Sequence, residues 1–227
     1  MRRIALDTET TGLDPKDGHR IVEIGCVELD LNIPTGKEWH SYVNPERMIP
    51  EAAFAVHGLS EEFLKKEPKF KDIAEDFNNF IKGAELVIHN AKFDIGFLNS
   101  ELKIANMPLI EMQQTIDTVQ LARKKIPGAA ASLDALCKRF EIDLSLREKH
   151  GALLDAKLLA EVYLQLTGGR QASLSLEQKH TEKTIETINK EEYVFDNLSF
   201  IKASLTEEEK EEHLEMIQKI NSSLWLK

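Results

Sequence analysis

Two acidic residues, Asp7 and Glu9, stand two positions apart near the end of an apolar segment that predicts a strand over residues 3–8. Side chains two apart on a strand leave the same face, roughly 7 Å apart along the strand. Two carboxylates so placed repel each other unless a cation lies between them. The pair agrees with a metal site and with a solvated strand end, and by itself it does not decide between them.

A third carboxylate, that of Asp155, falls on the apolar face of a helix predicted over 152–166. Spacings of three and four place it on one face with Ala152, Leu159, Val162 and Leu166. An unpaired carboxylate on an apolar face is unfavourable. A metal ligand, a salt bridge or a first-turn acid favoured by the helix dipole would each explain it.

Asp94 has a similar setting, because it follows a short buried strand predicted over 86–88 and begins a helix predicted over 93–105. His150 precedes Gly151 and is expected in the loop before the helix over 152–166, from which it can reach the same site; taken alone, it is equally well explained as a solvated loop residue. Oxygen ligands without a cysteine cluster suit Mg²⁺ or Mn²⁺ rather than a structural zinc ion.

Composition bounds the class of protein. The chain has 227 residues, of which 42% are hydrophobic and 30% charged, as in a soluble globular protein. No apolar run approaches about 18 residues, which excludes a membrane span, and Asp7 interrupts any signal peptide. Cys26 and Cys137 lie in apolar segments and are expected to be buried thiols in a cytoplasmic protein. The net charge of −10 disfavours a nucleic-acid partner unless bound cations offset it, so the motifs must decide.

The chain alternates strand and helix patterns up to Gly169, which predicts an α/β layer fold with a mixed sheet. Strands are predicted over 3–8, 21–31, 39–43, 86–88 and 115–117, and helices over 50–56, 70–81, 93–105, 118–125, 132–140 and 152–166. Residues 170–192 are polar and predict a flexible linker. A further helix is predicted over 206–221, with Thr206 as its N-cap.

Three segments together carry a specific resemblance. Residues 7–12 (DTETTG), 89–94 (HNAKFD) and 150–156 (HGALLDA) resemble, in order and separation, the three motifs of the DEDDh 3′–5′ exonucleases. The likeness covers roughly residues 1–170 and includes 56–59 (VHGL), which resembles the family's nucleotide-contacting element. Within the family, residues 150–169 resemble the proofreading epsilon subunits of bacterial DNA polymerase III. The resemblance implies a ribonuclease H-like sheet flanked by helices.

The resemblance also implies roles for individual residues. Asp7, Glu9 and Asp155 would ligate one divalent ion, Asp7 would bridge to a second ion supported by Asp94, and His150 would be the general base that yields a 5′-nucleoside monophosphate. The 3′-terminal nucleotide of single-stranded DNA would contact Asp7, Glu9, Thr10, Thr11, Gly12, Val56, His57, Phe93 and Asp155. For Val56 and Phe93, plain core packing remains an alternative.

The remainder of the chain resembles an interaction tail. Residues 171–176 (QASLSL) resemble the peptide that binds the bacterial sliding clamp, with Gln171, Leu174 and Leu176 as anchors. Only these three positions are constrained, so a chance match is the alternative. Residues 193–227 end in Leu224-Trp225-Leu226 and resemble the tail that docks on the catalytic subunit of DNA polymerase III; packing back onto the chain's own core is the alternative. The expected organisation is an exonuclease domain over 1–169, a linker over 170–192 and a polymerase-binding tail over 193–227.

Three functions fit these features. The first is a proofreading exonuclease that acts beside a replicative polymerase. The second is a stand-alone DEDDh nuclease acting on RNA ends or oligonucleotides, which the interaction tail disfavours. The third is a non-enzymatic scaffold between clamp and polymerase, which the complete set of signature residues disfavours.

Overall fold

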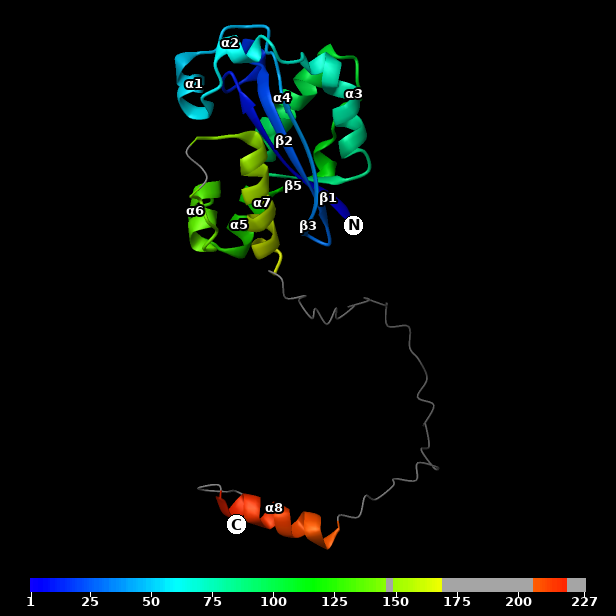
Figure 1. Cartoon of the computed structure of the whole chain (residues 1–227), viewed down its shortest axis with the longest axis vertical. Coiled ribbons are helices and arrows are strands. Elements are labelled where there is room, and N and C mark those ends of the chain that lie inside the picture. Colours follow the sequence, from blue (N-terminus) through cyan, green and yellow to red (C-terminus); the bar gives the residue numbers. More distant parts are fainter. Residues whose placement is uncertain (146–148, 169–205, 220–227) are drawn as a thin grey trace, which may run out of the picture. The chain divides into compact units, whose positions relative to one another are not determined.

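A computed structural model describes residues 1–145, 149–168 and 206–219 (Figure 1). The chain divides into two units, of which the second contains helix α8 (Glu207–Lys219). The expected boundaries at 169/170 and 192/193 lie outside the described residues, as do Gln171, Leu174, Leu176 and the segment 224–226.

A mixed five-stranded sheet forms the centre of the first unit, with the strand order β3-β2-β1-β4-β5. Its strands are β1 (Arg2–Thr10), β2 (Ile21–Asp30), β3 (Ile33–Tyr42), β4 (Glu85–Ile88) and β5 (Thr115–Asp117). β2 is antiparallel to both β1 and β3, whereas β4 runs parallel to β1 and β5 parallel to β4. The mixed sheet expected from the sequence is therefore present.

The third strand is longer than the predicted 39–43. Leu31 and Asn32 take positive φ angles of 49° and 68° and return the chain at once into β3. The early residues of β3 are exposed, so they carry no apolar alternation that would mark a strand.

The predicted helices are present, three of them with the predicted limits and three with ends shifted by one or two residues. They are α1 (Glu51–His57), α3 (Phe70–Ile81), α4 (Ala91–Ile104), α5 (Thr118–Lys125), α6 (Leu133–Arg139) and α7 (Ala152–Leu166). Helix α2 (Glu61–Leu64) and the 3₁₀ turns η1 (Pro15–Asp17) and η2 (Met112–Gln114) were not predicted, because elements this short show no apolar periodicity.

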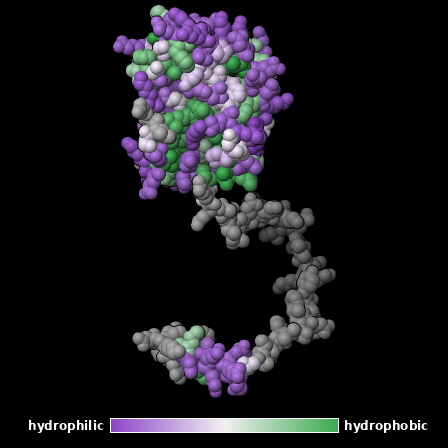
Figure 2. Space-filling view, in the orientation of Figure 1, coloured by the Kyte–Doolittle hydropathy of each residue, from purple (hydrophilic) through white to green (hydrophobic). Residues whose placement is uncertain are grey.

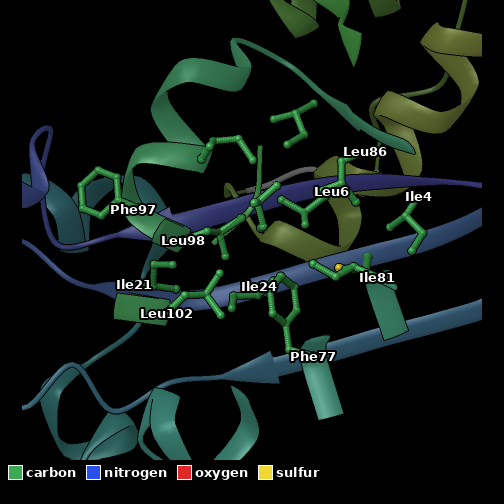
Figure 3. Close-up of a cluster of buried hydrophobic side chains, with 14 of the residues drawn as sticks. Ile4, Leu6, Ile21, Ile24, Phe77, Ile81, Leu86, Phe97, Leu98 and Leu102 are labelled. Carbon is green, nitrogen blue, oxygen red and sulfur yellow. The ribbon is translucent and has the colours of Figure 1, made fainter. Parts of the chain in front are cut away.

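Two hydrophobic clusters sandwich the sheet. Ile4 and Leu6 of β1 point to one face, where they pack with residues of α3 and α4 such as Phe77 and Phe97 (Figure 3). Ala5 points to the opposite face, which α5, α6 and α7 cover. Alternation along β1 therefore decides which layer each of its side chains meets, including the acidic residues at its end.

The first unit has a largely hydrophilic surface on its visible face (Figure 2), and the second unit contains a helix made mostly of charged and polar residues. Helix α8 begins after Thr206, as expected, and the Thr206 hydroxyl accepts the backbone N–H of Glu209 at 3.3 Å. Among the helices that the structure describes, none is long and apolar enough to cross a membrane.

Candidate active site

The carboxyl end of β1 positions the first two acidic residues. In the pairing of β1 with β2, Asp7 lies opposite Gly25 and Glu9 lies opposite Glu23. Because Ala5 faces α7, the alternation of the strand turns Asp7 and Glu9 to the α7 face and Thr8 to the other. Asp7 is half-buried and Glu9 is buried, which excludes a fully solvated strand end.

Gly25 lets α7 reach this edge of the sheet. A Cβ atom at Gly25 would lie 2.3 Å from the backbone nitrogen of Leu153 and 2.4 Å from the carbonyl oxygen of Ala152. The first turn of α7 therefore rests directly on β2, which brings Asp155 toward β1. Nothing in the sequence marks Gly25 for this role except that it is a single glycine inside an apolar strand, which indicates close backbone approach.

Three of the predicted residues meet at this point. Glu9, His150 and Asp155 each offer a ligand atom, and these atoms lie within 4.8 Å of one another. His150 lies in the loop before α7, as expected, and its Nδ1 is 3.3 Å from Oδ2 of the buried Asp155. Two carboxylates and one imidazole are a donor set that fits a divalent cation, with the carboxylates as the oxygen ligands that hard cations prefer.

Asp94 contacts the end of β1 through Thr8, the residue between Asp7 and Glu9. It is only 3% exposed, in the first turn of α4, and its Oδ1 accepts a hydrogen bond of 2.7 Å from the Thr8 hydroxyl. Burial raises the pKa of Asp94 to about 7, although the Thr8 hydroxyl opposes this shift. Asp94 is thus held near the end of β1 but outside the cluster of Glu9, His150 and Asp155.

A pocket of about 630 Å³ opens beside Glu9. It is lined by six other residues predicted to contact the nucleotide: Thr10, Thr11, Gly12, Val56, His57 and Phe93. Val56 is 47% exposed, which excludes simple core packing for this residue. Phe93 both packs in the core and lines the pocket: the centroids of the Phe93 and Phe97 rings are 5.0 Å apart, and Phe93 is part of the pocket lining. Asp7 and Asp155 do not line this pocket.

Sequence patterns do not single out His19 or Glu23. The His19 ring fills the space beside Gly12, and its Nδ1 is 3.1 Å from the Thr11 hydroxyl. Glu23 is buried across the strand pair from Glu9, and its Oε1 lies 2.8 Å from Nε2 of His40. His19 also lines the nucleotide pocket, and Glu23 is the β2 partner of Glu9, but the types and spacings of these two residues carry no motif.

The sequence of this chain is similar to those of known exonucleases and polymerase subunits. A family model for exonucleases matches residues 4–163, which include Asp7, Glu9, Asp94, His150 and Asp155. The chain is 51% identical over 227 residues to the DNA polymerase III subunit epsilon of Rickettsia prowazekii, with 97% of each chain covered. The chain belongs to the exonuclease family of these epsilon subunits.

Solved structures of exonucleases agree with this membership. Exonuclease X in complex with 5′-overhanging duplex DNA is 30% identical, with a TM-score of 0.57 over 73% of this chain and 90% of that one. The nuclease domain of 3′hExo, a DEDDh family member bound to rAMP, has a TM-score of 0.63 at 17% identity and covers 73% and 91% of the two chains, which shows the fold alone. The expected ribonuclease H-like exonuclease fold is confirmed.

We expect Gly25→Ala to damage both stability and activity in this exonuclease. The added methyl group meets the backbone of α7 rather than a flexible side chain, so the helix must move away from β2. Overpacking of this kind costs about 1–3 kcal/mol of unfolding free energy, and a shift of about 1 Å at a reactive site lowers rates up to roughly 100-fold. Denaturant unfolding and single-stranded DNA digestion measure the two effects.

Gly96→Ala is the matched control for stability, since a Cβ atom there meets nothing within 4 Å and the residue lies inside α4. It should leave the unfolding free energy unchanged or raise it by about 1 kcal/mol. Equal loss of stability in both variants would contradict the role given to Gly25.

Proposed function

We propose that this chain is the 3′–5′ proofreading exonuclease of a bacterial replicative DNA polymerase, which removes mismatched nucleotides from the 3′ end of DNA. The observation that carries this proposal is the adjacency of two features: the cluster of Glu9, His150 and Asp155, and a pocket that shares Glu9 and is large enough for one nucleotide. Membership in the exonuclease family of epsilon subunits supplies the reaction class.

The acidic residues would hold two divalent ions, Mg²⁺ or Mn²⁺. Asp7, Glu9 and Asp155 would bind the first, and Asp94 would support the second together with Asp7. Such ions, when bound, supply a water of lowered pKa and stabilise charge on the phosphate. The fold contributes the fixed positions of Asp7, Glu9 and Asp155, because α7 packs closely on the sheet at Gly25 of β2, the strand that pairs with β1.

His150 would accept the proton of the attacking water. Its ring is half exposed, whereas Asp155 beside it is buried. A neutral imidazole has one N–H and one lone pair, so an N–H at Nδ1 directed to the Asp155 carboxylate leaves the basic lone pair on Nε2. Asp155 thereby selects the tautomer of His150, and Nε2 is the atom that would take the proton.

His57 is suited to recognise the terminal nucleotide. Its Nδ1 accepts the backbone N–H of Leu59 at 3.0 Å, so in the neutral ring the N–H is on Nε2. Nε2 is buried and has no hydrogen-bond partner among the described residues, while the side chain lines the nucleotide pocket. Burial lowers the pKa of His57, which keeps the ring neutral. A nucleotide oxygen would complete the missing hydrogen bond.

Replacing His57 with alanine is therefore expected to lower kcat/KM for a single-nucleotide ester by about 10- to 100-fold, because one buried hydrogen bond is worth about 1–3 kcal/mol. His57→Gln retains a side-chain N–H donor and should recover part of the loss. Steady-state kinetics with the p-nitrophenyl ester of thymidine 5′-monophosphate measures both variants. Identical kcat/KM in the alanine variant and the wild type would exclude this contact.

The partners of the tail are part of the same proposal. The relative from Rickettsia prowazekii is named as a subunit of DNA polymerase III and is similar to this chain over 97% of its length. We assign residues 193–227 to docking on the polymerase catalytic subunit, and Gln171, Leu174 and Leu176 to the sliding clamp. Pull-downs with the full chain and with a form ending at Gly169 test this: both partners should be lost on truncation.

End-labelled single-stranded DNA and RNA of one sequence, incubated with Mg²⁺, Mn²⁺ or EDTA, test the enzymatic proposal. Stepwise shortening of the DNA from its 3′ end, release of 5′-nucleoside monophosphates and inhibition by EDTA are expected. A primer with a mismatched 3′ end should be shortened faster than a matched one. Hydrolysis of RNA alone would instead support the stand-alone nuclease, and no hydrolysis would support a scaffold.

A further inference from the structure

A second hollow lies beside the nucleotide pocket. Its volume is about 730 Å³, and it is formed between η1 with its flanking residues and one side of α4, two elements that contact each other. Leu13 and Phe93 line both hollows and so form the wall between them. A polymer whose last unit occupies the nucleotide pocket can therefore continue over this wall into the second hollow.

Three lysines line this hollow, which we call the lysine groove: Lys16, Lys92 and Lys103. All three are exposed, and none has its ammonium group within ion-pair distance of a carboxylate in the described part of the chain. The other charged residue of the lining is Asp14, whose Oδ1 accepts the backbone N–H of Lys16 at 2.9 Å. The lining thus carries three positive charges and one negative charge.

The charge of the neighbouring pocket has the opposite sign. Its lining includes Glu9 and Asp17 and contains no lysine or arginine. The amino end of the 14-residue helix α4 also faces the lysine groove through Asn90, whose side chain makes no capping hydrogen bond. Helix amino ends and unpaired lysines both attract phosphate groups. In a chain of net charge −10, this local reversal of sign marks a site for an anion.

Apolar side chains stand in solvent along the same groove. Leu13 is 86% exposed and Leu109 is 55% exposed, although both are large hydrophobic residues. Phe93 adds an aromatic ring at the wall. Surfaces that bind single-stranded nucleic acid combine positive charge for the phosphates with apolar or aromatic groups for the faces of the bases. The lysine groove offers both within one hollow.

We propose that the lysine groove binds the nucleotides that precede the 3′-terminal one in single-stranded DNA, with Lys16, Lys92 and Lys103 on their phosphates. This inference rests on the proposed exonuclease function. Leu13 and Phe93 separate the terminal nucleotide from the next, so the groove contributes to the binding of a strand and not to the chemistry of its last bond. Affinity for DNA longer than one nucleotide therefore depends on salt through these lysines.

The test compares two triple variants of the full chain. Lys16→Gln/Lys92→Gln/Lys103→Gln neutralises the groove, and Lys124→Gln/Lys125→Gln/Lys138→Gln removes the same charge from exposed residues of α5 and α6 that do not line it. The substrates are a thymidylate oligomer of about eight nucleotides, within the usual site size for single strands, and the single-nucleotide p-nitrophenyl ester. KM is measured between about 50 and 200 mM KCl.

For the oligomer, the slope of log KM against log salt should be lower by about 2 in the groove variant than in the wild type, since each phosphate contact contributes about 0.7. The α5/α6 variant should keep the wild-type slope. Both variants should hydrolyse the ester like the wild type, which also shows that they are folded.

Equal slopes in the groove variant, the α5/α6 variant and the wild type would overturn the proposal while leaving the exonuclease function intact. A wild-type chain that hydrolyses neither substrate would refute the proposed function, and the groove proposal with it. Loss of ester hydrolysis in the groove variant alone would also count against it, because it would place the lysines in the nucleotide pocket.

Discussion

Replacing Asp155 with asparagine is expected to lower the rate of 3′–5′ hydrolysis by about 10³-fold or more, because a catalytic metal site contributes several kcal/mol of charge stabilisation. Asparagine has nearly the same size and can still contact His150, so the packing of α7 is retained. What is lost is one negative charge facing Glu9, and with it the affinity for a cation. Rates at increasing Mg²⁺ and Mn²⁺, together with thermal unfolding, measure these effects.

Asp134→Asn is the matched control. Asp134 and Asp155 both lie in the first turn of a helix, α6 and α7 respectively, but Asp134 is exposed whereas Asp155 is buried. If Asp155 served only the helix dipole, both variants would lose about 0.3–1 kcal/mol of stability and neither would lose activity. Asp7→Ala and His150→Ala should behave like Asp155→Asn. Wild-type rates in well-folded Asp7→Ala protein would refute the assignment of the site.

For Asp94, removing the charge is expected to raise the stability of the metal-free protein while lowering activity. Burial raises the pKa of this carboxyl to about 7, compared with about 3.9 for an unfolded aspartate. The neutral form therefore stabilises the fold below about pH 4, and this contribution is lost as the pH rises through 7. Asparagine stays neutral at every pH, and its Oδ1 can still accept the hydrogen bond from Thr8.

In EDTA at pH 8, Asp94→Asn should therefore exceed the wild type by a few kcal/mol in unfolding free energy, since each pKa unit corresponds to about 1.4 kcal/mol. The difference should shrink toward zero as the pH is lowered to about 4. Denaturant unfolding across this pH range measures the difference. A difference in unfolding free energy that does not change with pH would contradict the idea that burying the charged Asp94 carboxylate destabilises the fold. So would an Asp94→Asn protein that is less stable than the wild type at pH 8.

Local patterns were sufficient to predict most of the elements. Helices α3, α5 and α7 and strand β5 have the predicted limits, because apolar periodicity, turn residues and helix ends act over a few neighbouring residues. The start of β3 could not be predicted, because its exposed residues pair with β2 through backbone groups that leave no trace in residue type.

Sequence patterns were sufficient to predict which residues would carry the chemistry and on which kind of element each one lies. The three-dimensional fold was needed to show that Glu9, His150 and Asp155 meet, and that Asp94 accepts a hydrogen bond from Thr8. Such encounters depend on how closely two layers pack, and here that distance is set by the absence of a side chain at Gly25. The lysine groove likewise exists only because η1 lies against α4, a contact between segments far apart in the chain.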